Sequence, residues 1–471
     1  MIHQIQLYTK KIFQALAFRL GHFYNWRRMQ VQVKDRSLLS LSWPLFITFG
    51  IATCQPMMDS WFLSRTSESA AAGVGALMPV LGALFMAINA FAQAGASIAS
   101  QFIGAERPRQ AGTTQTMVLF GSLLLGVAIT LVIIPLNNQI VSWMGLTGEA
   151  AHHARDFLHI VSIGFAFRAL QSCLTSLIAT HGLTVWNLLG NFITIISNAI
   201  MNVIFLNGYL GFPQMGVKGV ALATMLSWLI AASILFLILR IKVHHKIRRT
   251  DFKRSRVILP DWIRIGFPAA VEPVSFQIFQ VVLTAIVVHL GIIAMTARIF
   301  SANFAMLAVI LSVGLSSGNQ ILVAHLVGAH DFDKANRRLH QSLIAGSASG
   351  LIVAIIVALF GTQLLSFYTS DPEVIRLGKL CLWCDVILQP FKAANMVITS
   401  ALRASGDSKF PAIVGSAMMW TCGLGTALLL AFGLDLGLVG IWLGMAADEF
   451  YRSIVNYIRW RGGKWKQYGV V

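Results

Sequence analysis

Long apolar stretches alternate with short polar segments from about residue 38 to near the end of the chain. Most stretches run for about 20 residues or more, the length that a helix needs to cross roughly 30 Å of hydrocarbon. Glycine, proline and charged residues mark the breaks between them. The pattern predicts twelve membrane-spanning helices, near residues 38–63, 72–102, 115–136, 155–179, 184–206, 217–240, 262–288, 293–326, 340–367, 374–402, 410–432 and 437–460.

Composition supports an all-α integral membrane protein. Of the 471 residues, 56% are hydrophobic and only 11% are charged, with a mean hydropathy of +0.71. A soluble chain of this length would carry about 25% charged residues, because it needs polar surface facing water. A soluble globular fold is therefore excluded.

The formal net charge of +18 raises two alternatives, a nucleic-acid partner or a membrane orientation signal. The basic residues gather before the first span, in the segment 240–264 and after the last span, whereas the external loops carry few. This placement follows the positive-inside rule, and no base-reading motif accompanies the basic runs. We therefore expect no nucleic-acid partner, a bilayer location with both termini cytoplasmic, and a bacterial inner membrane.

The chain repeats itself at an offset of 224 residues. This shift places Pro44 on Pro268 and Gly104 on Gly328, and it also aligns Gly126 with Gly350, Glu149 with Glu373, Thr175 with Thr399, and Gly182 with Gly406. Each copy holds six spans, an even number, so both copies enter the membrane the same way round. We expect two lobes related by a pseudo-twofold axis along the membrane normal, with the functional cavity between them.

The repeat sets the expected domain organisation. Its five parts are a basic amphipathic segment (1–37), a first six-helix lobe (38–240), a basic cytoplasmic linker (241–261), a second six-helix lobe (262–460) and a cytoplasmic tail (461–471). The first segment has a rough helical stripe with basic flanks, which fits either an interfacial helix on anionic lipid or a loosely ordered tail.

Six short motifs, in order along the chain, resemble those of the multidrug and toxic compound extrusion (MATE) family. They are 58–65 (MDSWFLSR), 71–75 (AAGVG), 101–105 (QFIGA), 326–330 (LVGAH), 402–409 (LRASGDSK) and 459–466 (RWRGGKWK). The fifth is similar to that family's "RGAGDTK" turn after the tenth helix. The resemblance covers about residues 38 to 468, which is effectively the whole membrane domain.

The resemblance implies a two-lobed, V-shaped transporter that exports organic compounds, often cationic or amphipathic, in exchange for sodium ions or protons. It implies no enzyme activity and no cofactor other than the coupling ion. We expect a small-molecule substrate, a lipid bilayer around the protein and a monomer. The twelve histidines show no metal-ligand spacing, so the one metal considered is a sodium ion at Asp59.

Asp59 lies about twenty residues into the first span, where a fixed charge costs at least about 2.5–3.5 kcal/mol. A proton or a sodium ion would neutralise it, and the family places an acidic residue here. In the fifth span, Asn198 and Asn202 share a helix face with Asn191, and their carbonyl groups could join a cation site with Asp59. The alternatives are a solvated Asp59 near the external end of its helix and asparagines that only join helices.

Glu272 stands a few residues after Pro268, and we expect it one or two turns from the cytoplasmic face. It resembles a glutamate of the DNA-damage-inducible branch of the family, where a gating or proton-accepting role is implied. The alternative is a carboxylate that is stabilised by the dipole at a helix start.

Two basic residues, Arg168 and Lys392, occupy equivalent positions of the two copies and would favour anionic or zwitterionic cargo if they line the cavity. Lys392 stands where another branch carries a cation-coupling aspartate, which argues against a second-lobe sodium site of that type. We expect Lys392 to pair with Asp385 or Glu272, or to snorkel. Arg298, early in the eighth span, completes the cavity and gating set.

Three other function classes compete with ion-coupled export. A lipid-linked or metabolite flippase of the same superfamily shares the repeat but usually carries a more charged cavity. A membrane enzyme needs clustered catalytic groups, whereas Asp59, Glu272 and Asp385 are scattered along the chain. An ATP-driven pump needs a phosphate-binding glycine loop, and the chain has none.

Overall fold

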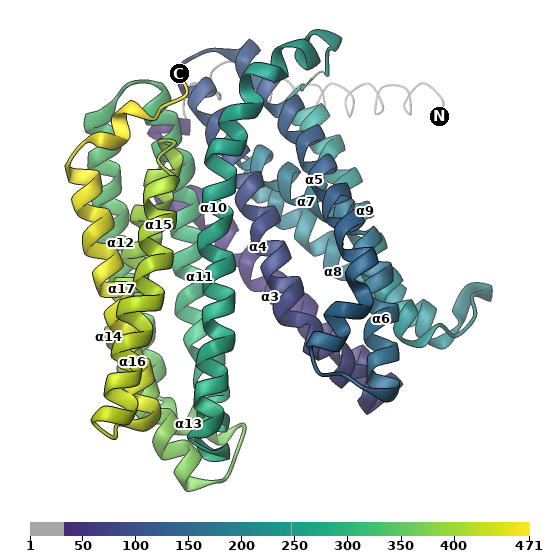
Figure 1. Cartoon of the computed structure of the whole chain (residues 1–471). Helices are drawn as coiled ribbons and strands as arrows, with labels where there is room; N and C mark the ends of the chain where they lie inside the picture. Colours follow the sequence, from purple (N-terminus) through teal and green to yellow (C-terminus); the bar gives the residue numbers. More distant parts are fainter. Residues whose placement is uncertain (1–32, 246) are drawn as a thin grey trace, which may run out of the picture.

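The computed structural model describes residues 33–245 and 247–471, and within these ranges the protein is built from helices without a β-strand. Most of the expected amphipathic segment 1–37 lies outside the described residues. Figure 1 shows two bundles of helices that lie closest together near the C-terminus and diverge toward the opposite end.

The first bundle is built from the N-terminal half of the chain. Its helices are α3 (Leu38–Thr66), α4 (Glu68–Gly104), α5 (Pro108–Trp143), α6 (Gly148–Ile163), α7 (Phe165–Thr180), α8 (Thr184–Asn207) and α9 (Gly216–Lys242), with short 3-10 turns at Val33–Asp35 and Tyr209–Gly211. Helices α6 and α7 meet at Gly164 with a bend of 51° and together make one broken span. The bundle therefore contributes six spans.

The second bundle is built from the C-terminal half. Its helices are α10 (Arg249–His289), α11 (Ile292–Gly328), α12 (Phe332–Leu359), α13 (Gly361–Ser366), α14 (Pro372–Ala404), α15 (Lys409–Met418), α16 (Leu424–Leu428) and α17 (Gly437–Arg461), and a 3-10 turn follows at Lys464–Gln467. Two π-helical turns, η4 (Met419–Gly423) and η5 (Leu429–Gly433), join α15 and α16 into one span that ends at Gly433.

The expected all-α membrane fold of twelve spans agrees with these helices. Within the described residues, nine helices are long and apolar enough to cross a membrane, and the bent pair makes ten. Helices α14 and α17 are also long enough, with 33 and 25 residues, but they carry charged side chains in their middle. The charged side chains in the middle of these helices contact hydrogen-bond donors, an aromatic ring or opposite charges inside the bundle, as described below. We therefore count both helices as spans.

The 224-residue repeat of the sequence is also present in the backbone conformation. Gly182 and Gly406 follow helices with positive φ angles of 72° and 95°. Glu106 and His330, which are also one repeat apart, have φ angles of 58° and 55°. L-residues rarely adopt this left-handed region, so the shared conformation marks equivalent turns at the same end of both lobes.

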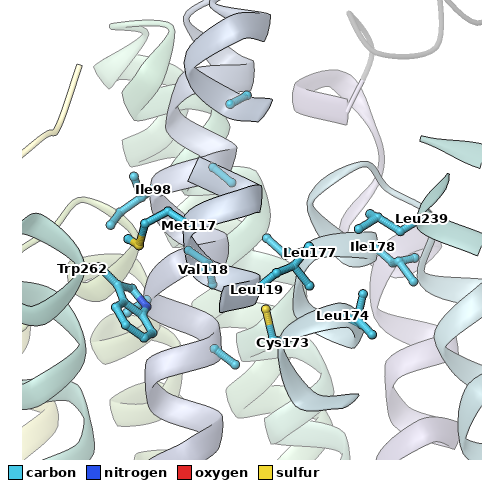
Figure 2. Packing of buried hydrophobic residues seen from close by; sticks show 14 of the residues in the cluster. Ile98, Met117, Val118, Leu119, Cys173, Leu174, Leu177, Ile178, Leu239 and Trp262 are labelled. Atoms are coloured by element: carbon cyan, nitrogen blue, oxygen red, sulfur yellow. The ribbon is translucent and has the colours of Figure 1, made fainter. Parts of the chain in front are cut away.

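The lobes meet through the helices that lie nearest the pseudo-twofold axis. Trp262 of α10 packs into an apolar cluster of the first lobe together with Ile98 and Met117, as Figure 2 shows, and its indole nitrogen donates to the Phe91 carbonyl oxygen over 2.9 Å. The Gln320 amide donates to Ser97 across the interface over 2.9 Å. Most of the expected linker, 241–261, is helical. Its first two residues end α9, and its residues from Arg249 onward already belong to α10, an interlobe helix.

Candidate functional site

The central carboxyl group of the first lobe is Asp59 on α3, whose side chain is buried with 5% exposure. Asn202 of α8 donates its amide to Asp59 Oδ1 over 3.2 Å, and Thr224 of α9 donates its hydroxyl to Oδ2 over 3.3 Å. Asn202 also donates to Asn198 Oδ1 over 3.1 Å, and Asn198 donates to Thr224 over 3.3 Å. The structure thus brings together the three residues that the sequence placed in one cation site.

The donors around Asp59 are all neutral. Among the described residues Asp59 forms no ion pair. Asn202 Oδ1 is buried and has no hydrogen-bond partner there, so one more acceptor oxygen is free beside the carboxylate. A buried carboxylate without a cation is costly, and a proton or a small monovalent cation at this place would remove that cost.

Sequence reasoning missed Thr224, and Asn191, which it placed on the same helix face as Asn198 and Asn202, does not join the site. Asn191 donates to the Asn187 carbonyl oxygen of its own helix and is not among the partners of Asp59. Thr224 carried no signal of its own, because a threonine in a membrane helix usually donates to a carbonyl oxygen one turn earlier. The Val220 carbonyl oxygen does lie in this position, 2.9 Å from the hydroxyl, and shares the single hydroxyl proton with Asp59.

A cavity of about 80 Å³ lies between the lobes, nearer the end of the molecule that carries the C-terminus. Its walls come from α3, α4, α7 and α8 of the first lobe and from α11 of the second. The polar residues among its lining are Gln93, Ser97, Ser100, Thr175, Ser176, Asn187, Ser317 and Gln320. None of the described lining residues is charged, and Asp59 is not one of them, so the cavity and the carboxyl site are separate features.

The two basic residues at equivalent repeat positions both lie over aromatic rings. The Arg168 guanidinium lies 5.3 Å from the centre of the Phe85 ring, and the Lys392 ammonium lies 5.8 Å from that of Phe276. Arg168 also donates to Gln171 over 3.2 Å. Neither residue forms an ion pair within the described part of the chain, so both keep a positive charge that is only partly compensated.

Lys392 forms neither expected salt bridge in the described structure, although its charge interacts with that of Asp385 at longer range. Asp385 instead accepts from Gln389 over 2.9 Å and from the Trp442 indole over 3.4 Å. Glu272 pairs with Arg403 and Arg452. Arg298 donates to Thr284 over 2.9 Å and to the Gln280 side chain over 3.1 Å, which ties α11 to α10.

Glu272 does not stand at the start of its helix, which was the alternative that the sequence left open. Helix α10 begins at Arg249, so Glu272 lies 23 residues into a helix of 41 and is buried near its middle. The helix continues through Pro260, Pro268 and Pro273, whereas the sequence interpretation took Pro268 to lie near the start of a span. A helix-start role for this carboxylate is thereby excluded.

The MatE family model matches the chain twice, over residues 44–204 and 268–429. The two matches together cover more than half of the chain and begin 224 residues apart, at Pro44 and Pro268. The chain belongs to the MatE family. The resemblance that its motifs suggested is therefore confirmed, and so are the internal repeat and the transporter class.

MATE relatives and solved MATE structures match along almost the whole chain. An uncharacterized transporter, YisQ of Bacillus subtilis (strain 168), is 29% identical over 442 residues, covering 93% of this chain and 96% of the relative. A probable multidrug resistance protein, NorM of Thermotoga maritima, is 26% identical over 423 residues, covering 88% and 89%. An outward-facing multidrug resistance MATE transporter has a TM-score of 0.85 at 21% identity, covering 93% and 98%, and a MATE in complex with MaL6 has a TM-score of 0.84 at 22% identity, covering 93% and 99%.

Membership places the described features within a membrane transporter, since MATE proteins are transporters and not enzymes. In this MATE chain the first lobe holds a carboxyl group between neutral donors. The second lobe holds Glu272 in an ionic cluster. The two lobes are thus alike in fold and unlike in buried charge.

Proposed function

We propose that this protein exports organic compounds from the bacterial cytoplasm by antiport against protons or sodium ions, with Asp59 as the coupling group. The observation that carries the proposal is the neutral setting of that buried carboxyl between α3, α8 and α9. Such a group changes its charge when a proton or cation binds, and the change alters the hydrogen bonds that hold three helices together.

The position of Asp59 supports loading from outside the cell. Asp59 lies seven residues before the end of α3 at Thr66, and the first residues of α3 lie at the other membrane face. With both termini in the cytoplasm, as the basic segments indicate, the Asp59 end of α3 faces outward. Binding of the coupling ion there and release of cargo from the interlobe space would then alternate as the lobes rock. We propose a monomer in the inner membrane.

The cargo class follows from the interlobe residues. The cavity of about 80 Å³ is smaller than a typical small-molecule site, so cargo would bind when the lobes move further apart. Its uncharged polar lining, with Leu45 and Phe49 beside it, suits an organic compound of mixed polarity. Arg168 and Lys392 are not among the residues that line this cavity, and their two positive charges would favour anionic or zwitterionic compounds over strongly cationic ones if the cargo passes them.

The test is transport in proteoliposomes under an imposed pH gradient, an imposed sodium gradient, or neither. The cargo is a panel of fluorescent cations and anions, with Asp59→Asn beside the unchanged protein. Asp156→Asn is the matched control, because Asp156 is a partly exposed carboxylate that pairs with Lys218 over 3.4 Å. We expect gradient-driven movement that Asp59→Asn abolishes and Asp156→Asn keeps.

Movement that needs no gradient and survives Asp59→Asn would contradict the coupling role. That result would instead favour a flippase or a passive pathway. The gradient that drives transport identifies the ion, since a proton site responds to pH at constant sodium and a sodium site responds to sodium at constant pH.

A further inference from the structure

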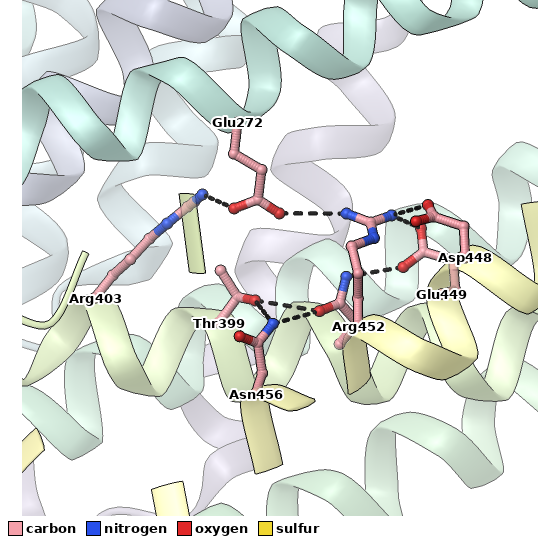
Figure 3. A network of polar contacts seen from close by, with 8 residues as sticks. Glu272, Thr399, Arg403, Asp448, Glu449, Arg452 and Asn456 are labelled. Atoms are coloured by element: carbon pink, nitrogen blue, oxygen red, sulfur yellow. Dashed lines mark hydrogen bonds and ion pairs between the residues drawn. The ribbon is translucent and has the colours of Figure 1, made fainter. Parts of the chain in front are cut away.

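The second lobe encloses an ionic cluster that has no counterpart around Asp59. Arg452 of α17 lies between three carboxylates, as Figure 3 shows. Its Nη2 atom is 2.7 Å from Asp448 and 2.9 Å from Glu449, and its Nη1 atom is 3.3 Å from Glu272. Arg403 of α14 pairs with the other oxygen of Glu272 over 2.7 Å. Three spans, those of α10, α14 and α17, therefore share one network.

The charges of this cluster do not balance. Three carboxylates, Glu272, Asp448 and Glu449, face two guanidinium groups, those of Arg403 and Arg452. The three acids and Arg452 are each less than 9% exposed. With every acid ionised, the cluster would bury one uncompensated negative charge, which is strongly unfavourable in a low-dielectric interior.

The surrounding elements supply no further cation to these contacts. Glycines of the span made by α15 and α16 face the cluster. Gly415 of α15 packs against Glu272, and Gly423 of η4 packs against Asp448. From α14 the Asn395 amide donates to Glu449 over 2.8 Å, and this donor is neutral. Among the described residues, the charged groups in these contacts are thus the five already named.

One unsatisfied acceptor atom indicates where a proton would bind. Asp448 Oδ1 is buried without a hydrogen-bond partner in the described structure, as are the Nε atoms of Arg403 and Arg452, and Asp448 and Arg452 are each only 3% exposed. Asp448 also lies beside the π-helical turn η4, and such turns inside α-helices are frequent at functional sites. The cluster therefore lacks a hydrogen-bond donor at Asp448 Oδ1.

We propose that the Asp448–Glu449 pair on Arg452 is a second proton-binding site, which holds one exchangeable proton in the C-terminal lobe. On binding, a carboxylate oxygen takes up the proton to form a carboxylic acid, and the cluster becomes neutral. A proton suits this place better than a metal cation, because the Arg452 guanidinium already occupies the space between the two acids. Proton uptake would weaken one contact to Arg452 and so change how α17 is held against α10. This inference is independent of whether transport is coupled at Asp59.

The first test is infrared spectroscopy of the protonated-carboxyl stretch in the full-length protein in nanodiscs, as a function of pH. The background is Asp59→Asn/Asp385→Asn, which removes two other buried carboxyls whose hydrogen-bond donors are neutral. We expect one protonated-carboxyl band to remain in this background near neutral pH, and to disappear on further addition of Asp448→Asn or Glu449→Gln. Absence of any such band in the folded background would overturn the proposal.

The second test counts protons by potentiometric titration of the purified protein. The proton belongs to the cluster and not to one acid. We therefore expect the same single proton to be lost in Asp448→Asn, in Glu449→Gln and in the double variant. Asp156→Asn should lose no proton near neutral pH. Unchanged proton counts in both folded single variants would overturn the site. A count that depends on sodium at constant pH would also overturn it, in favour of a metal cation.

The two tests separate this inference from the proposed function. Loss of coupled transport in Asp59→Asn concerns the first lobe only. The infrared band and the proton count of the cluster are measured without transport and in the absence of Asp59.

Discussion

Gly104 and Gly328, which are one repeat apart, each lie against the backbone of the other lobe. A β-carbon on Gly104 would overlap the carbonyl oxygen of His325, and one on Gly328 would overlap that of Gln101. Gln101 and His325 are themselves one repeat apart, so the two contacts are related by the pseudo-twofold axis. The lobes thus approach at backbone distance where α4 and α11 end, and only glycine permits this approach.

We expect Gly104→Ala to open this contact. The added methyl group would force the α4 and α11 ends apart, at a cost of about 1–3 kcal/mol for overpacking. Gly112→Ala is the control, because a β-carbon at Gly112 of α5 meets no atom within 4 Å, and alanine should stabilise that helix by up to about 1 kcal/mol. Spin-label distances between the α4 and α11 ends should lengthen in Gly104→Ala alone. Equal distances in both variants would show that the glycine pair does not determine how closely the two lobes approach.

Asn202→Leu should impair coupling while the protein stays folded. The substitution removes the amide that donates to Asp59 and to Asn198. Loss of a hydrogen bond to a charged group costs about 1.5–3 kcal/mol, which corresponds to a tenfold to hundredfold loss of ion-driven transport. Asn207→Leu on the same helix is the control, since Asn207 is exposed and donates only within its helix, to Val203. Thr224→Ser should keep activity and Thr224→Val should lower it, because the hydroxyl donor is the feature that matters.

Much of this architecture could be predicted from the sequence, because helix length, loop charge and the 224-residue offset are properties of the chain itself. Helix periodicity placed Asn198 and Asn202 on one helix face, and the resemblance to the family suggested that this face belongs with Asp59. The partners of Glu272 did not, because Arg403 and Arg452 are 131 and 180 residues away and their contacts depend on how α14 and α17 rotate about their axes. The continuation of α10 through three prolines could not be predicted either, because each proline alone favours a helix boundary.

Replacing Arg168 and Lys392 together by glutamine should shift the cargo preference toward cations. Both groups lie over aromatic rings and form no salt bridge in the described structure, so the substitutions remove two positive charges without breaking a salt bridge. Competition between a fluorescent anion and a fluorescent cation in proteoliposomes measures the change, and we expect the anion to lose at least tenfold. Arg376→Gln is the control, because Arg376 is an exposed residue that pairs with Glu373 over 2.9 Å. An unchanged preference would place the two basic groups outside the cargo path.

His245, which follows α9, should make the protein less stable in acid. Burial, which Asp251 opposes and Arg240 reinforces, lowers the pKa of its imidazole from 6.5 to about 4. Above pH 6.5 the side chain is neutral in both the folded and the unfolded state. Between pH 6.5 and 4 the unfolded state binds a proton that the folded state does not, so the free energy of unfolding falls as the pH falls, by up to about 3 kcal/mol.

Thermal melts of the protein in detergent across this pH range check the prediction. His245→Gln should flatten the acid loss, because glutamine does not titrate and can keep a hydrogen bond to Thr116, which now lies 3.1 Å from the imidazole Nε2. His152→Gln is the control, since the His152 side chain is 67% exposed, and it should leave the pH dependence as it is. An acid loss of the same size in His245→Gln would assign the pH dependence to other groups.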